Sequence, residues 1–113
     1  MERLQVGEFE ELVLLITAIL NGSAYGVSVK DEILEQTGRK INISAVHTAL
    51  DRLEKKGFLD SKIGGVTPDR GGRRKRIFGV NQLGIEVIIL IRETRNRLFK
   101  QIPQSAFNLM SGS

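Results

Sequence analysis

The chain has 113 residues, of which 41% are apolar and 27% charged, and a formal net charge of +4. This length and composition are typical of one globular domain and exclude an intrinsically disordered chain. The chain contains no cysteine, which excludes disulfides and thiolate metal sites and fits a reducing compartment.

Three helices are predicted in the first half of the chain. From Glu8 to Leu20 apolar residues recur at helical spacing, and an Asn-Gly-Ser stop follows. A second helix is expected from Gly26 to about Gln36. The third begins after Asn42, a good N-cap, and ends at 55–57, where two lysines suit the helix dipole and a glycine suits the residue after the cap.

The period then changes from helical to alternating. Phe58 to Ile63 is predicted as a strand, Gly64 to Gly72 as a loop, and Arg73 to Val80 as a returning strand. Asn81 can cap a last helix from about Gln82 to Ile102, which Pro103 stops, and the remaining residues to Ser113 are predicted as a frayed tail.

This order of elements is that of a winged helix-turn-helix, mainly α with a small β-hairpin. We expect residues 1–80 to form the winged-helix domain, residues 81–102 a C-terminal helix, and residues 103–113 a flexible tail. The third helix would then be the reader helix of a DNA-binding protein, and the hairpin its wing.

The positive charge of the chain is concentrated around the predicted wing. Between Arg52 and Arg76 there are nine Lys and Arg against three acids, a local charge of +6, so the other residues sum to −2. A patch of this kind is suited to neutralising phosphates and releasing their counterions. The alternative is a solvated basic hairpin that only keeps the protein soluble.

Four segments of the sequence resemble the PadR family of bacterial transcriptional regulators, in the family's order and spacing. They are Gly7 to Leu15, Tyr25-Gly26, Leu50 to Phe58 and Gly71 to Arg74, and the resemblance covers roughly Leu4 to Leu90. The Leu-Asp-Arg-Leu-Glu block is its most specific part. The resemblance implies a winged-helix repressor that dimerises through its C-terminal helix and binds a palindromic operator.

The chain departs from the family pattern at several positions. His47 stands where the family usually has tyrosine, and Thr48 where it often has proline. Residues 80–84 read Val-Asn-Gln-Leu-Gly where Leu-Thr-Pro-Glu-Gly is common, although Asn81 preserves the capping chemistry. Some relatives stack planar drugs against a tryptophan, a residue that this chain lacks, so that ligand mode does not transfer.

The N-terminal part of a reader helix enters the major groove, which places Asn42, Ser44, His47 and Thr48 nearest to bases or phosphates. The alternative for Asn42 is that its side chain is used up as the helix cap. His47, the single histidine, is either a DNA contact or an ordinary surface residue. The hydroxyl of Tyr25 could reach a phosphate, with a purely structural role as its alternative.

Strand side chains alternate between faces, so the basic residues of the wing cannot all point one way. Arg73 and Lys75 share one face, while Arg74 and Arg76 share the other with the inward-facing Phe78. Phosphate clamping is expected, with insertion of an arginine into a narrow minor groove as the sharper alternative. The residues predicted to contact DNA at the wing are Arg70, Arg73, Arg74 and Lys75.

Arg52 and Glu54 are predicted to form a buried or half-buried structural pair that ties the reader helix to the wing, with base reading by Arg52 as the alternative. For the last helix, the apolar surface is too wide to be covered by one side of a small domain. Together with the resemblance, this predicts a dimerisation face that consists of Leu83, Val87, Ile91, Leu98 and Ile102. Exchange of this helix between subunits remains open.

An enzyme is not expected. The sequence has a single histidine, no cysteine, no phosphate-binding glycine loop of the right spacing and no paired carboxylates at a predicted cleft. We expect no cofactor and no metal. The remaining alternative to operator binding is a winged-helix module for protein–protein or RNA interaction. A small-molecule effector could bind between the subunits, but no residue cluster identifies one.

The sequence also predicts where the protein resides. Met1 to Leu4 lacks the charged and then apolar pattern of a secretory signal. The longest nearly apolar run, Ile85 to Ile91, contains Glu86 and is far shorter than the roughly 18 residues of a membrane span. We therefore expect a soluble, cytoplasmic protein without a membrane partner.

Overall fold

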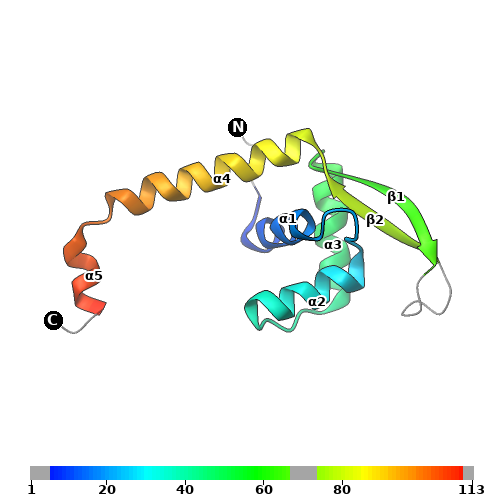
Figure 1. The fold of residues 1–113 in the computed structure, drawn as a ribbon, viewed down its shortest axis with the longest axis horizontal. Helices are drawn as coiled ribbons and strands as arrows, with labels where there is room; N and C mark the ends of the chain where they lie inside the picture. The colour runs from blue at the N-terminus through cyan, green and yellow to red at the C-terminus, as the bar shows by residue number, and fades with distance from the viewer. Residues whose placement is uncertain (1–5, 67–73, 111–113) are drawn as a thin grey trace.

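The computed structural model describes residues 6–66 and 74–110. Three helices, α1 (Glu8–Leu20), α2 (Gly26–Thr37) and α3 (Ile43–Lys55), pack against one another and carry a hairpin and a long fourth helix (Figure 1). The bounds predicted for α1 are confirmed, and those of α2 and α3 agree to within about one residue. The predicted winged helix-turn-helix is therefore the observed fold.

Local signals explain where the helices begin and end. The Asn42 side chain accepts a hydrogen bond from the Ser44 N–H at 2.7 Å and so caps α3. Gly38 and Gly57, which follow α2 and α3, have φ of 75° and 89°, the left-handed region in which glycine has no steric penalty. The predicted cap and the predicted glycine stop of α3 are thus confirmed.

A single hydrophobic core lies between the helices and the base of the hairpin. α3 contributes four residues at helical spacing, and Phe58 is fully buried where the chain leaves α3. The fourth helix reaches this core through one buried residue. The buried apolar residues are Val13, Leu14, Ile16, Ala24, Val29, Ile33, Val46, Ala49, Leu50, Leu53, Phe58, Leu59, Phe78 and Val87.

The hairpin pairs β1 (Leu59–Val66) with β2 (Arg74–Val80) in antiparallel register, with Ser61 opposite Phe78. β1 continues three residues past the predicted end at Ile63, across an irregularity in the pairing between Ile63 and Val66. The prediction was too short because two glycines, poor strand formers, follow Ile63. The Phe78 N–H donates to the Ala24 carbonyl at 2.7 Å, which fastens the wing to the turn between α1 and α2.

The fourth helix, α4 (Gln82–Gln101), starts on the core and then leaves it. Asn81 caps it by accepting from the Gly84 N–H at 2.9 Å and also donates to the Gly57 carbonyl. Its second half extends away from the other helices (Figure 1). The radius of gyration is accordingly 16.8 Å, against about 13 Å for a compact domain of this length.

The prediction of a frayed tail after Pro103 was wrong, because the segment contains a further helix, α5 (Gln104–Met110). Pro103, the predicted helix stop, lies just before this helix and does not interrupt it. α5 lies at the far end of α4 from the hairpin (Figure 1). The division of the chain into 1–80 and 81–102 stays a prediction.

None of the helices in the described part of the chain is long and apolar enough to cross a lipid bilayer.

Candidate nucleic-acid interface

α3 presents a polar face to solvent. Its buried residues, from Val46 to Leu53, define one side of the helix, and at 100° per residue the opposite side is a single row of exposed residues. That row consists of Ser44, Thr48, Asp51 and Lys55. Two of these, Ser44 and Thr48, were predicted as DNA contacts, whereas Asp51 and Lys55 were not, because the prediction assumed docking by the N-terminal part of the helix.

The predicted contacts at the start of α3 are already ordered by internal hydrogen bonds. Asn42 accepts from both the N–H and the hydroxyl of Ser44, so its oxygen serves as the helix cap, the alternative stated above. The Thr48 hydroxyl donates to the Ser44 carbonyl at 2.9 Å. A hydroxyl that donates one hydrogen bond can still accept another, so Ser44 and Thr48 retain acceptors on the outward face.

One flank of α3 brings together three predicted site residues from three elements. The Lys75 ammonium of β2 lies 4.2 Å from the centre of the Tyr25 ring, a cation–π contact. The imidazole of exposed His47 lies against Gly26, so closely that a Cβ at position 26 would be less than 3.0 Å from the ring. Tyr25 and Gly26 are adjacent in the chain, so the contact of Lys75 and the contact of His47 fall on neighbouring residues at the start of α2.

The other described basic residues of the wing differ in their surroundings. The Arg76 guanidinium donates to the Ser61 hydroxyl at 2.8 Å, and that hydroxyl donates to the Glu54 carboxylate at 2.5 Å. Arg76 is thereby tied toward the end of α3. Arg74 is exposed. The predictions for Arg70 and Arg73 lie outside the described residues.

The predicted pair of Arg52 and Glu54 is wrong, because the two side chains have different partners. Glu54 does connect α3 to the wing, through Ser61. The side chain of Arg52 is 67% exposed and extends toward α1, with its Nη1 3.9 Å from Glu10 Oε2. The two residues lie 200° apart around the helix, so they cannot share a partner on the hairpin.

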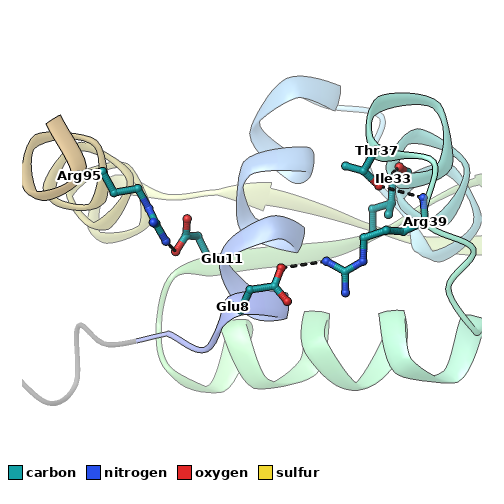
Figure 2. A network of polar contacts seen from close by, with 6 residues as sticks. All are labelled: Glu8, Glu11, Ile33, Thr37, Arg39 and Arg95. Atoms are coloured by element: carbon teal, nitrogen blue, oxygen red, sulfur yellow. Dashed lines mark hydrogen bonds and ion pairs between the residues drawn. The ribbon is translucent and has the colours of Figure 1, made fainter. Parts of the chain in front are cut away.

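The first turn of α1 holds three carboxylates, and each pairs with a cation on a different part of the fold. Glu8 accepts from Arg39, after α2, at 2.8 Å, and Glu11 accepts from Arg95 of α4 at 2.8 Å (Figure 2). The third acid, Glu10, pairs with the end of α3. Acids suit the positive end of a helix dipole, but sequence reasoning missed their partners, which lie up to 84 residues away.

The tie between α1 and α4 is electrostatically favourable. The hydrogen bond that Arg95 donates to Glu11, and then the negative charge of Glu11, raise the pKa of Arg95 above its ordinary value. The guanidinium is therefore charged at every pH at which the folded protein is studied.

The residues predicted for dimerisation divide into two groups. Val87 is fully buried in the core of its own chain, and Leu83 and Ile91 are partly buried against it. Leu98 and Ile102, further along α4, are 53% and 38% exposed. Sequence reasoning missed two exposed aromatic residues in the same region, Phe99 and Phe107, because Phe99 lies off the predicted stripe and Phe107 was assigned to the tail.

Within residues 6–66 and 74–110, no group of three or more His, Asp or Glu side chains gathers in a way that could hold a metal ion.

Solved structures with the same fold are transcriptional regulators. A PadR-like regulator from Bacillus cereus is 13% identical, with 93% of each chain covered and a TM-score of 0.68. A PadR-family regulator from Clostridium difficile is 18% identical, with 89% of this chain and 99% of that chain covered and a TM-score of 0.67.

A third similar structure is that of hsRosR in a complex, which is 15% identical, with 97% of this chain and 89% of that chain covered and a TM-score of 0.69. No protein-family model and no curated protein matches the sequence. At these identities the likeness establishes the fold. The first two neighbours are transcriptional regulators.

Proposed function

We propose that this protein is a transcriptional regulator that binds double-stranded DNA sequence-specifically as a homodimer, on a palindromic operator, and acts as a repressor. Its fold is that of PadR-like regulators over nearly the whole chain. Repression rests on the sequence resemblance to that family. This role places the protein in the cytoplasm.

The observation that carries the proposal is that Lys75 of the wing and His47 of α3 contact neighbouring residues, Tyr25 and Gly26, at the start of α2. A reader helix enters the major groove with its N-terminal part. Its flanks then face the phosphate strands that border the groove. Lys75 stacked on Tyr25 is held beside α3, where a cation would contact one of those strands, and Arg74 follows on the wing.

A homodimer is supported by the apolar surface at the far end of the molecule. Leu98, Phe99 and Phe107 are about half exposed or more on α4 and α5. A seven-residue helix such as α5 is marginal unless it packs against something. A symmetric dimer formed through the end of α4 and α5 would present two reader helices. Two such helices match the two half-sites of a palindromic operator.

The alternative of a protein-interaction or RNA-binding module is less well supported. The outward face of α3 is polar, whereas a protein-docking face would be apolar at its centre. RNA recognition favours exposed aromatic residues for base stacking. Among the described residues, the aromatic side chains more than 45% exposed are Phe99 and Phe107. They lie on α4 and α5, far from the wing.

Fluorescence anisotropy tests the proposal. A labelled duplex from the region upstream of the gene is compared with a scrambled duplex, from about 50 to 300 mM salt, because phosphate contacts make affinity salt-dependent. Tight binding to the upstream duplex that survives scrambled competitor supports an operator-binding regulator. Equal and steeply salt-dependent binding to both would contradict specificity for this region. No binding to either duplex at low salt would favour the protein-interaction module.

A further inference from the structure

We propose that Glu10 is a positioning residue that limits DNA affinity by holding Lys56 and Arg52 at the end of α3 against α1, where they contribute little to phosphate binding. This inference rests on the proposed function, because it concerns how the same reader helix meets DNA. A single acid of α1 would thereby lower the number of phosphate contacts that the protein makes.

The contacts of Glu10 are those of a half-enclosed carboxylate clamp. Its side chain is only 12% exposed, and its Oε1 lies 2.5 Å from Lys56 Nζ. Its other oxygen, Oε2, lies 3.9 Å from Arg52 Nη1. The two oxygens thus face two cations, Arg52 and Lys56, which lie four residues apart on one flank of α3, the flank opposite to His47.

This clamp borders the surface that would receive DNA. Glu10 and Arg52 line one open groove together with the predicted contacts Ser44 and Thr48. Charges interact over about 8–10 Å at ordinary salt, and over longer distances where water is partly excluded. A carboxylate beside the groove therefore repels phosphate and competes with it for Arg52 and Lys56.

The competition has a measurable consequence. Affinity depends on salt because each cation that neutralises a phosphate releases counterions, with a slope of about −0.9 per contact on a log–log scale. A cation already neutralised by a carboxylate releases few counterions on binding. Removing the charge of Glu10 should therefore add about one phosphate contact, steepen the salt dependence accordingly and strengthen binding to any duplex.

The chain offers a matched control in the next residue. Glu11 lies in the same helical turn, is 19% exposed, and makes an ion pair of 2.8 Å, but its partner is Arg95 on α4. Glu10→Gln and Glu11→Gln change the net charge equally. They differ in whether the released cation is on the reader helix.

The test is the salt dependence of anisotropy with a labelled duplex of arbitrary sequence. We expect Glu10→Gln to steepen the slope by about 1, which means roughly 3.5-fold more affinity lost between about 50 and 200 mM salt than for the unmodified protein. Glu11→Gln should leave the slope within about 0.3 of the unmodified value. Circular dichroism and thermal melting check that both variants are folded.

A second comparison tests Lys56 itself and does not require Glu10→Gln to fold. Lys55 is exposed on the outward face of α3, whereas Lys56 is clamped. Lys55→Gln should therefore lower the slope by about 1 and Lys56→Gln by much less. In a double variant, adding Lys56→Gln to Glu10→Gln should return the slope to that of the unmodified protein.

The outcomes separate this inference from the proposed function. If the unmodified protein binds no duplex at low salt, the proposed function fails and the inference fails with it. If the unmodified protein binds, but Glu10→Gln and Glu11→Gln have equal slopes, or Lys55→Gln and Lys56→Gln have equal effects, the inference alone is overturned.

Discussion

Among the glycines of residues 6–64 and 74–110, Gly84 has the least room for an added methyl group. A Cβ there would lie less than 3.0 Å from the Phe58 carbonyl oxygen and 2.6 Å from Val80 Cγ1. The Phe58 backbone cannot move aside easily, because its N–H donates to Leu53 and its carbonyl accepts from Asn81. Gly84→Ala must therefore push α4 away from the start of the hairpin.

Two effects of opposite sign decide the magnitude. Alanine is about 1 kcal/mol more favourable than glycine inside a helix. Overpacking of a well-packed core costs about 1–3 kcal/mol, and a clash with hydrogen-bonded backbone belongs at the upper end of that range. The net expectation is a loss of about 2 kcal/mol of unfolding free energy, or roughly 8 °C in Tm.

The assay is thermal unfolding followed by far-UV circular dichroism, at one protein concentration because an oligomer gains stability with concentration. Gly79→Ala is the matched control, since Gly79 is exposed on β2 and a Cβ there meets nothing within 4 Å. This control should melt at or slightly above the unmodified protein. If Gly84→Ala is as stable as Gly79→Ala, the close approach of α4 to Phe58 is wrong.

The other expectations concern DNA binding and assembly. Gly26→Ala should displace the His47 ring, which can rotate, and so change the DNA affinity measured by anisotropy. Because the ring can move, Tm should fall by less than about 4 °C. A larger fall would show that the ring is locked in place. Lys75→Ala should weaken binding to all duplexes and lower the salt slope by about 1, whereas loss of affinity for one sequence only would indicate base reading. Leu98→Asp should give monomers in light scattering that keep their helix content and lose operator binding. Asn96→Asp is the control and should stay dimeric. A Leu98→Asp variant that stays dimeric would place the interface elsewhere.

Much of the fold could be predicted because its signals are local. Asn42 and Asn81 cap α3 and α4 through hydrogen bonds to residues two and three positions away, and Gly57 ends α3 through its own backbone conformation. Apolar spacing identified the buried side of α3 for the same reason, since four residues make one turn. The concentration of basic charge around the wing is also a property of the sequence alone.

The candidate site could be predicted only in part, because which side chains meet depends on packing between distant segments. The sequence places Tyr25 and Lys75 far apart, and only the fold stacks one on the other. Arg52 comes close to Glu10 because α1 packs against α3. No periodic pattern or cap encodes which helices pack together.

The sequence by itself determined the elements from α1 to α4, their order and the sign of the charge near the wing, since hydrogen bonds within a turn and side-chain periodicity act over a few residues. The tertiary structure alone decided which charges face one another, as with Glu10 and Lys56, and which apolar residues stay exposed, as with Leu98 and Phe107. Both outcomes depend on how whole helices pack, and packing sums contacts between residues that are tens of positions apart.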